Sequence, residues 1–281
     1  MQHAIFSQTE QREFMRDAKN DSKLTWEEIA SLLGISRAMV FVYLKGTSKI
    51  PRGNFLRLCG IAGKNPAVKF VEIFNKEQDI RQIGEMTEEM AEFIGILAGD
   101  GSLSLSHHEV AVSGHLKLDE EFMIGRVARL LSRLFGVRVK IKRHLKNNNI
   151  RCVVNSKRLS NFLASRFGLP KGKKLGKLHI PQEIAESPKY LSSYLRGLFD
   201  TDGSIYMRRK RSLVLSIISK DALYLQEVKK GMEDLGFHPS VSGKNLYLYR
   251  QHEIDRFFLR IKPQNRKHLQ RFRRLKGSIA L

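Results

Sequence analysis

Two aspartates carry the clearest chemical signal in the sequence. Asp100 and Asp202 each end an apolar, helix-like stretch, and each is followed by Gly-Ser and strand-like residues. The glycine can end a helix in the left-handed conformation, so each carboxylate is expected at a helix C-terminus. Such an end carries about half a negative charge. Two ends and two carboxylates brought together would bind a divalent cation, with Mg²⁺ or Mn²⁺ as the expected cofactor.

The residues before these aspartates are suited to close helix packing. Gly95 and Gly99 are four residues apart, and so are Gly197 and Thr201, so each pair lies on one helix face. Small residues at this spacing let two helix backbones approach closely. We therefore expect the two helices to pack side by side with their C-terminal carboxylates together. Divalent ions that bridge carboxylates and a phosphate commonly hydrolyse phosphodiesters.

The aspartates belong to two copies of one longer pattern. The segment 92–105 matches 194–207, and the equivalent aspartates are 102 residues apart. A strand, an amphipathic helix, a hairpin and a further helix follow in both copies. The expected fold class is therefore α+β, with two αββαββα halves related by a pseudo-twofold axis. The offset is too long for a solenoid repeat of about 20–50 residues.

Composition shifts divide the chain into four expected segments. Residues 1–84 have helical periodicity and are expected to form a small all-α domain. The two halves follow at 85–169 and 188–281, and the second ends in a basic tail. Residues 170–187 between them are rich in Gly, Pro and Lys, as is typical of a linker.

The first segment contains a helix-turn-helix pattern. Thr25 and Glu28 can form a capping box, Gly34 can supply the turn, and Ser36 can cap the next helix. The pattern resembles a lambda-repressor/Cro-type domain, whose second helix enters the DNA major groove. An ordinary helical hairpin, or one that contacts protein through the apolar Phe41, is the alternative. The resemblance places on the exposed face Ser36, Arg37, Ala38, Phe41 and Lys45.

The net charge of +22 indicates a polyanionic partner, and nucleic acid is the leading class. The excess is uneven. Residues 1–84 have a net charge of +4, whereas residues 85–281 have +18. The strongest polyanion contact is therefore expected in the last two thirds of the chain.

Several other classes are disfavoured by composition. No apolar run approaches the roughly 20 residues of a membrane span, and the first residues lack the apolar region of a signal peptide. Cys59 and Cys152 are the only cysteines, which excludes a disulfide framework and a multi-cysteine zinc site. An intracellular protein is expected, in the cytoplasm or associated with the nucleoid.

The duplicated motif resembles a known family. FIGILAGDG at 93–101 and LRGLFDTDG at 195–203 are similar to the two LAGLIDADG (DOD-type) motifs of single-chain homing endonucleases. The resemblance covers roughly residues 85–265. It implies a monomeric, site-specific double-strand DNA endonuclease that forms a saddle over a long, roughly pseudo-palindromic target. It also implies that Asp100 and Asp202 bind the metal.

The resemblance implies further catalytic residues. A basic or polar side chain is expected near the scissile phosphate at the start of the third helix of each half, which is Lys157 in the first copy and His252 in the second. Polar residues before the middle helix, around Lys117 and around Ser219 and Lys220, are expected to order the attacking water.

The strands are expected to supply the DNA-binding face. They alternate polar and apolar residues, so one face packs on helices and the other points outward. Antiparallel strands can enter the major groove, where Arg and Lys suit guanine and phosphate. The candidate outward residues are Arg138, Lys140, Lys142, Tyr206, Arg208, Lys210 and Tyr249.

Two alternatives stay open from the sequence. The same fold could serve a transcription regulator that binds DNA without cutting it, although the presence of both aspartates argues against this. The family also contains RNA-splicing maturases, and for such a protein the partner would be intron RNA.

Overall fold

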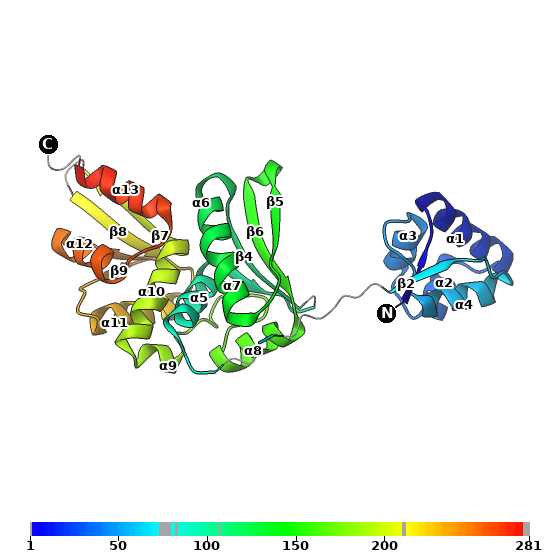
Figure 1. Ribbon diagram of the computed structural model, residues 1–281, viewed down its shortest axis with the longest axis horizontal. Coiled ribbons are helices and arrows are strands. Elements are labelled where there is room, and N and C mark those ends of the chain that lie inside the picture. Colours follow the sequence, from blue (N-terminus) through cyan, green and yellow to red (C-terminus); the bar gives the residue numbers. More distant parts are fainter. Residues whose placement is uncertain (1, 73–79, 82–83, 107, 210–211, 278–281) are drawn as a thin grey trace. The chain divides into compact units, whose positions relative to one another are not determined.

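The computed structural model divides into two compact units, residues 1–76 and 77–281 (Figure 1). No helix in its described part is long and apolar enough to cross a membrane. The structure describes residues 2–72, 80–81, 84–106, 108–209 and 212–277.

Four helices and a small sheet make up the described part of the first unit. The strands β1 (Gln2–Ile5) and β2 (Lys69–Glu72) pair antiparallel, an element that the expected all-α domain did not include. The helices pack around Met15, Ile29 and Phe55, which are almost fully buried. The helices are α1 (Gln8–Ser22), α2 (Trp26–Leu33), α3 (Arg37–Leu44) and α4 (Arg52–Ala62).

Local capping defines the ends of α2 and α3. Thr25 Oγ1 accepts a hydrogen bond from Glu28 N at 3.3 Å, and Thr25 N donates to Glu28 Oε2 at 2.7 Å, which is a capping box. Gly34 ends α2 in the left-handed conformation with φ 67°. Ser36 then caps α3 through Met39 N. The turn between the helices is therefore specified by local sequence.

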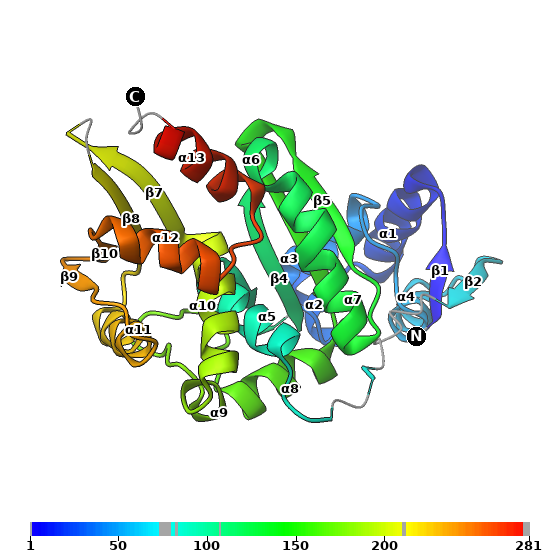
Figure 2. The same cartoon turned by 60° about the vertical axis from the view of Figure 1, so that its left-hand side comes forward.

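The second unit contains two copies of one α+β arrangement, which confirms the expected fold class. In each half a long helix leads into a four-stranded antiparallel sheet whose strand order is the same, β3-β4-β6-β5 and β7-β8-β10-β9. The two long helices, α5 and α10, lie side by side between the sheets in both views (Figures 1 and 2).

The first half runs from α5 to α8. Its middle helix is continuous from α6 through the π-helical η1 to α7, whereas the equivalent α11 of the second half is a regular α-helix. The elements are α5 (Glu88–Gly99), β3 (Gly101–Leu103), β4 (Glu109–His115), α6 (Leu116–Phe122), η1 (Met123–Val127), α7 (Ala128–Phe135), β5 (Lys140–His144), η2 (Leu145–Asn147), β6 (Asn149–Asn155) and α8 (Lys157–Phe167).

The second half repeats this order and adds a final helix. A short helix in the linker precedes it, and α13 extends the chain beyond the repeated pattern. The elements are α9 (Gln182–Ala185), α10 (Pro188–Asp202), β7 (Gly203–Arg208), β8 (Ser212–Ile218), α11 (Ala222–Asp234), β9 (Ser240–Ser242), β10 (Asn245–Leu248), α12 (Gln251–Arg260) and α13 (Arg266–Gly277).

One hydrophobic core runs through both halves. It includes Phe93 of α5, Tyr194 and Phe199 of α10, and apolar residues of both sheets. Cys59 and Cys152 are free and buried, in the first unit and in this core respectively. The halves of the second unit are therefore one folded body.

Two glycines bring the backbones of α5 and α10 into direct contact. A methyl group placed on Gly95 would lie 2.0 Å from Tyr194 O, and one on Gly197 would lie 2.0 Å from Glu92 O. Tyr194 and Glu92 occupy equivalent positions in the two motifs, so the contact is reciprocal. At the C-terminal end a methyl group on Gly99 would lie 2.1 Å from Thr201 Oγ1. At Gly95 and Gly197 the neighbouring atoms are backbone, so a larger residue could not fit there without moving a helix.

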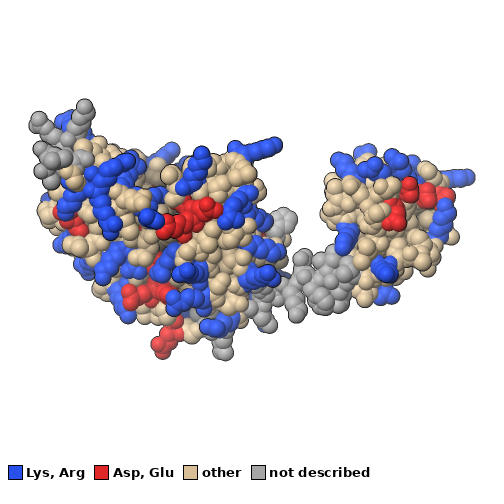
Figure 3. Space-filling model, turned by 45° about the horizontal axis from the view of Figure 1, so that its top comes forward, with Lys and Arg blue, Asp and Glu red and all other residues tan. Residues whose placement is uncertain are grey.

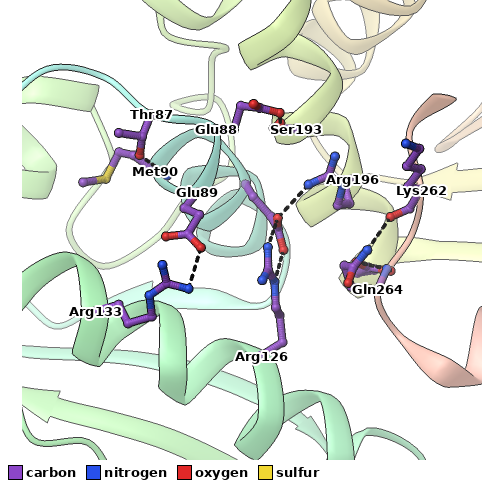
Figure 4. Close-up of polar contacts among 12 residues, drawn as sticks. Thr87, Glu88, Glu89, Met90, Arg126, Arg133, Ser193, Arg196, Lys262 and Gln264 are labelled. Atoms are coloured by element: carbon purple, nitrogen blue, oxygen red, sulfur yellow. Dashed lines mark hydrogen bonds and ion pairs between the residues drawn. The ribbon is translucent and has the colours of Figure 1, made fainter.

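A buried ion pair joins the same two helices. The fully buried carboxylate of Glu92 accepts a hydrogen bond from Arg126 Nε at 2.6 Å and one from Arg196 Nη1 at 3.0 Å (Figure 4). Arg126 belongs to the first half and Arg196 to the second. Arg196 Nε also donates to Ile261 O at 2.7 Å, so this network links α5, η1, α10 and the end of α12.

We predict that Gly95→Ala destabilises the second unit by about 3 kcal/mol or more, because the added methyl meets a carbonyl oxygen that no rotamer change can move. Gly125→Ala is the matched control, because a methyl there meets nothing within 4 Å. Thermal or urea unfolding measures both variants. Equal stability of the two would contradict the proposed backbone contact.

Candidate metal and nucleic-acid site

The two aspartates lie at the C-terminal ends of α5 and α10. Asp100 caps α5, and Asp202 is the last residue of α10. A methyl group on Gly99 of α5 would lie 3.3 Å from Asp202 Oδ2, so the second carboxylate reaches the end of the first helix. The close contact of the helices therefore brings both carboxylates to one place.

The glycines that follow the aspartates do not adopt the left-handed conformation expected from the sequence. Gly203 is extended, with φ −81° and ψ 157°, and Gly101 is not among the positive-φ residues. In each half the chain passes directly from the helix into the strand and stays close to that helix. A methyl on Gly203 would lie 2.2 Å from Phe199 O, and one on Gly101 would lie 2.4 Å from Leu97 Cα. Close packing is therefore the reason for glycine here.

The carboxylates are partly desolvated and repel each other. Burial, together with the nearby Asp100, raises the pKa of Asp202 to about 7. Asp100 is open to solvent on one side, but protein around it still raises its pKa through desolvation. Lys267 and Lys174 act in the opposite direction on both pKa values. A divalent cation would relieve the same repulsion.

Lys174 of the linker lies at the end of α5. Its ammonium donates hydrogen bonds to the carbonyl oxygens of Leu97, Ala98 and Gly99 at 2.7, 3.1 and 2.6 Å. These carbonyls have no partners within the helix, so a cation is favourable there. Burial lowers the pKa of Lys174 to about 8, and Asp202 and Asp100 oppose this shift.

Lys267 of α13, in the second half, lies near enough to Asp100 and Asp202 to lower the pKa of both. Its Nζ is 2.8 Å from Asp119 Oδ1 of α6, so it joins the two halves. Asn265 precedes it and is almost fully buried. The Asn265 side-chain amide donates to Asp119 Oδ1 at 2.9 Å and to Asp200 O at 3.0 Å. These bonds fix the start of α13 against both halves.

Lys174 and Lys267 were not among the residues expected from the sequence, although a signal was present. Each lies seven residues after the end of the third helix of its half, α8 at Phe167 and α12 at Arg260. Equivalent positions in two copies of a motif indicate a shared role. The signal lay in the linker and the basic tail, where a lysine is unremarkable by itself.

The structure does not bring Lys157 and His252 to the carboxylates. Asp100 O accepts a hydrogen bond from Ser113 N, and Ser113 pairs with Arg151 of β6. From there β6 continues for about 13 Å, at about 3.3 Å per residue, before α8 begins at Lys157. His252 has the equivalent place at the start of α12. The segments that follow the C-terminal ends of α8 and α12 return to the carboxylates, with Lys174 and Lys267.

Of the residues before the middle helices, those in the second half lie near an aspartate. Lys220 and Ser219 line one hollow together with Asp202 and Lys174, and its volume is about 330 Å³. Lys117 lies in the first turn of α6 with its side chain exposed.

The outward face of the first sheet is charged. Val110 and Val112 of β4 point into the core, so Glu109 and its alternate neighbours point outward. Glu109 forms ion pairs with Arg151 at 2.7 Å and with Lys142 at 3.7 Å. The exposed basic residues of this region include Arg138, Lys140 and Lys142.

The outward face of the second sheet is aromatic. Tyr247 and Tyr249 stack with ring centroids 5.5 Å apart, and the Arg208 guanidinium lies 5.8 Å from the Tyr249 ring. Burial raises the pKa of Tyr206, and the neighbouring Tyr247 and Tyr249 add to this shift. Lys210, also expected on this face, lies outside the described residues. The view in Figure 3 shows many more Lys and Arg than Asp and Glu side chains.

In the first unit, α3 presents a mixed face. Ser36, Arg37 and Lys45 are exposed, as expected from the helix-turn-helix pattern. Phe41 is half-buried beside Trp26, with ring centroids 6.0 Å apart. Arg37 lies over the Phe41 ring and pairs with Glu27 of α2 at 3.6 Å.

The described residues contain no group of three or more His, Cys, Asp or Glu side chains that could hold a metal ion. Asp100 and Asp202 would therefore need water or substrate oxygens to complete a coordination sphere. Mg²⁺ is commonly bound in this way, through one or two carboxylates and substrate phosphates.

Comparison with known proteins finds sequence relatives that are much longer than this chain. The replication factor C small subunit of Methanocaldococcus jannaschii is 36% identical over 139 residues, which are 49% of this chain and 7% of that protein. An A-type ATP synthase subunit of Pyrococcus horikoshii is 28% identical over 162 residues, or 58% of this chain and 15% of that protein. The chain therefore spans a small part of these relatives.

Solved structures with a similar arrangement include the homing endonuclease I-DmoI and WhiA. A mesophilic variant of I-DmoI has a TM-score of 0.45 and 17% identity, over 62% of this chain and 88% of that one. The N-terminal LAGLIDADG domain of DUF199/WhiA has a TM-score of 0.46 and 18% identity, over 65% and 88%. By sequence, residues 189–277 match the family described as a LAGLIDADG-like domain.

Proposed function

We propose that this protein is a site-specific double-strand DNA endonuclease that hydrolyses phosphodiesters with divalent metal held by Asp100 and Asp202. One observation carries the proposal: two carboxylates from two copies of one motif meet at adjoining helix ends, partly desolvated and flanked by two lysines. A structural helix cap would not require this convergence. The match of the second copy to the LAGLIDADG-like domain agrees with the proposal.

The donor set suits Mg²⁺ or Mn²⁺. Both side chains offer carboxylate oxygen, and burial raises both pKa values, with Asp100 adding to the shift of Asp202; a dication would reverse these shifts. When bound, such an ion polarises the phosphate and lowers the pKa of its bound water. Asp100 and Asp202 would hold it, and DNA oxygens would complete its coordination.

The two lysines would act on the phosphate. Lys174 of the linker and Lys267 of the second half lie near the carboxylates, and each is held by other protein groups. Fixed cations at a site where negative charge develops stabilise the transition state without reorganising. Lys220, beside Asp202 in the same hollow as Lys174, could order the attacking water.

The two sheets would bind the DNA on either side of the cut. The first offers Lys140 and Lys142, which suit guanine and phosphate, and the second offers tyrosines with Arg208. The N-terminal unit would add a second contact through Ser36, Arg37 and Lys45 of the helix-turn-helix. A non-cleaving regulator on the same fold would use these surfaces without the metal site.

We predict that Asp100→Asn and Asp202→Asn each lower cleavage by more than about 10³-fold, because each removes several kcal/mol of metal-dependent stabilisation. DNA affinity should change little, because Asn has the same shape. Gel-based cleavage and binding assays with Mg²⁺ measure both. Cleavage at the wild-type rate by both variants would refute the assignment, and binding without cleavage by the wild type would favour a regulator.

We predict that Lys174→Met and Lys267→Met each lower the cleavage rate by about 10²-fold, because each removes a positioned cation from the transition state. Lys157→Met is the control, since Lys157 is exposed at the far end of its sheet. Single-turnover cleavage at saturating protein separates the rate from binding. A larger loss for Lys157→Met than for the other two would restore the assignment made from sequence.

We predict that a fragment of residues 77–281 retains metal-dependent cleavage at the same phosphodiesters but binds DNA more weakly. The unit has its own core, and the tethered first unit would raise the effective DNA concentration at a second contact. Footprinting and cleavage mapping of both proteins on one substrate test this. A shifted cut would show that the first unit sets the register, and an unchanged footprint would favour a protein partner for it.

A further inference from the structure

The final helix α13 is strongly basic and has no counterpart in the described part of the first half. Its twelve residues include no acidic side chain. Lys267, Arg271 and Arg274 are spaced i, i+4 and i+7, so they share one face of the helix. Its six basic residues are Arg266, Lys267, Arg271, Arg273, Arg274 and Lys276.

This helix is fixed firmly to the second unit. Phe272 stacks on Phe258 of α12 with centroids 3.9 Å apart, and the buried His268 packs on Phe199 of α10. The bonds of Asn265 hold its start against both halves. In Figures 1 and 2, α13 lies along β7, and it also contacts α6 of the first half. Its basic face is therefore presented in one orientation.

That face borders an open groove of about 580 Å³. The walls come from α6 through Leu118, from β7 through Gly203 and Ser204, and from α13 through its three aligned basic residues. Among the described residues, no acidic side chain lines the groove. Gly203, which lines the groove, directly follows Asp202 at the end of α10, so the groove lies next to the second aspartate.

We propose that this groove binds consecutive phosphates of a DNA strand next to the cut, as a rigid backbone clamp between the two halves. The inference rests on the proposed function and extends it to Arg271 and Arg274. Arginine suits this role because its planar guanidinium can bind phosphate oxygens in a bidentate manner. Such contacts position the strand without reading its sequence.

Two basic residues of α13 outside the groove offer a matched control. Arg266 and Arg273 are exposed on the same helix and do not line the groove. Arg266 pairs only at the surface, with the exposed Glu121 at 3.1 Å. Arg266→Gln/Arg273→Gln therefore removes the same charge as Arg271→Gln/Arg274→Gln, from the same helix, and leaves the groove intact.

The experiment compares wild type and both double variants in binding a mixed-sequence DNA duplex over a series of salt concentrations without divalent metal. The groove variant should bind about tenfold more weakly and lower the slope of log K against log salt by about 2, because two phosphate contacts are lost. The control should change both much less. Thermal unfolding verifies that all three proteins are folded.

Equal losses in the two double variants would overturn the groove, because only general charge would then matter. Poly-glutamate is then added as a competitor of bound DNA. Equal competition for wild type and for the groove variant supports the clamp. Competition that is present for wild type and lost in the groove variant would indicate that the groove binds an acidic peptide instead. Failure of the folded wild type to bind any duplex would overturn the proposed function itself, separately from the comparison of variants.

Discussion

The contact between the backbones of α5 and α10 is the constraint on which the rest of this structure depends. Gly95 and Gly197 let each helix rest on a carbonyl oxygen of the other, and that spacing determines where Asp100 and Asp202 lie. The same crossing puts Glu92 within reach of arginines from both halves. A larger side chain at either glycine would therefore disturb folding and the candidate site together.

The crossing has an electrostatic consequence. Two helix C-termini and two carboxylates converge in a partly desolvated place, which raises the pKa values of both aspartates. The chain offsets this repulsion with Lys174 and Lys267, which reach the site from segments that follow the third helix of each half. The two lysines, a bound metal ion and a polyanionic substrate would all change the protonation of the same two carboxylates, because each of them interacts with the same negative charges.

The sequence was most informative where a pattern occurred twice. The two motifs indicated the α+β halves and the close helix packing, because spacing alone places small residues on one helix face. The position of Lys174 depends on how the linker after α8 folds back onto the end of α5. A local sequence motif does not determine that path. The role of Gly203 in packing against Phe199, and the pairing of β1 with β2, also depend on contacts between distant segments.

The proposed catalysis depends on Asp100 and Asp202 together binding the metal ion at the DNA. The most direct test is a crystal of the protein with its DNA and Mn²⁺, measured at the manganese absorption edge. We expect anomalous density between these two carboxylates, in contact with a DNA phosphate. Density elsewhere in the protein, or none at the two aspartates in a complex that holds DNA, would contradict the claim.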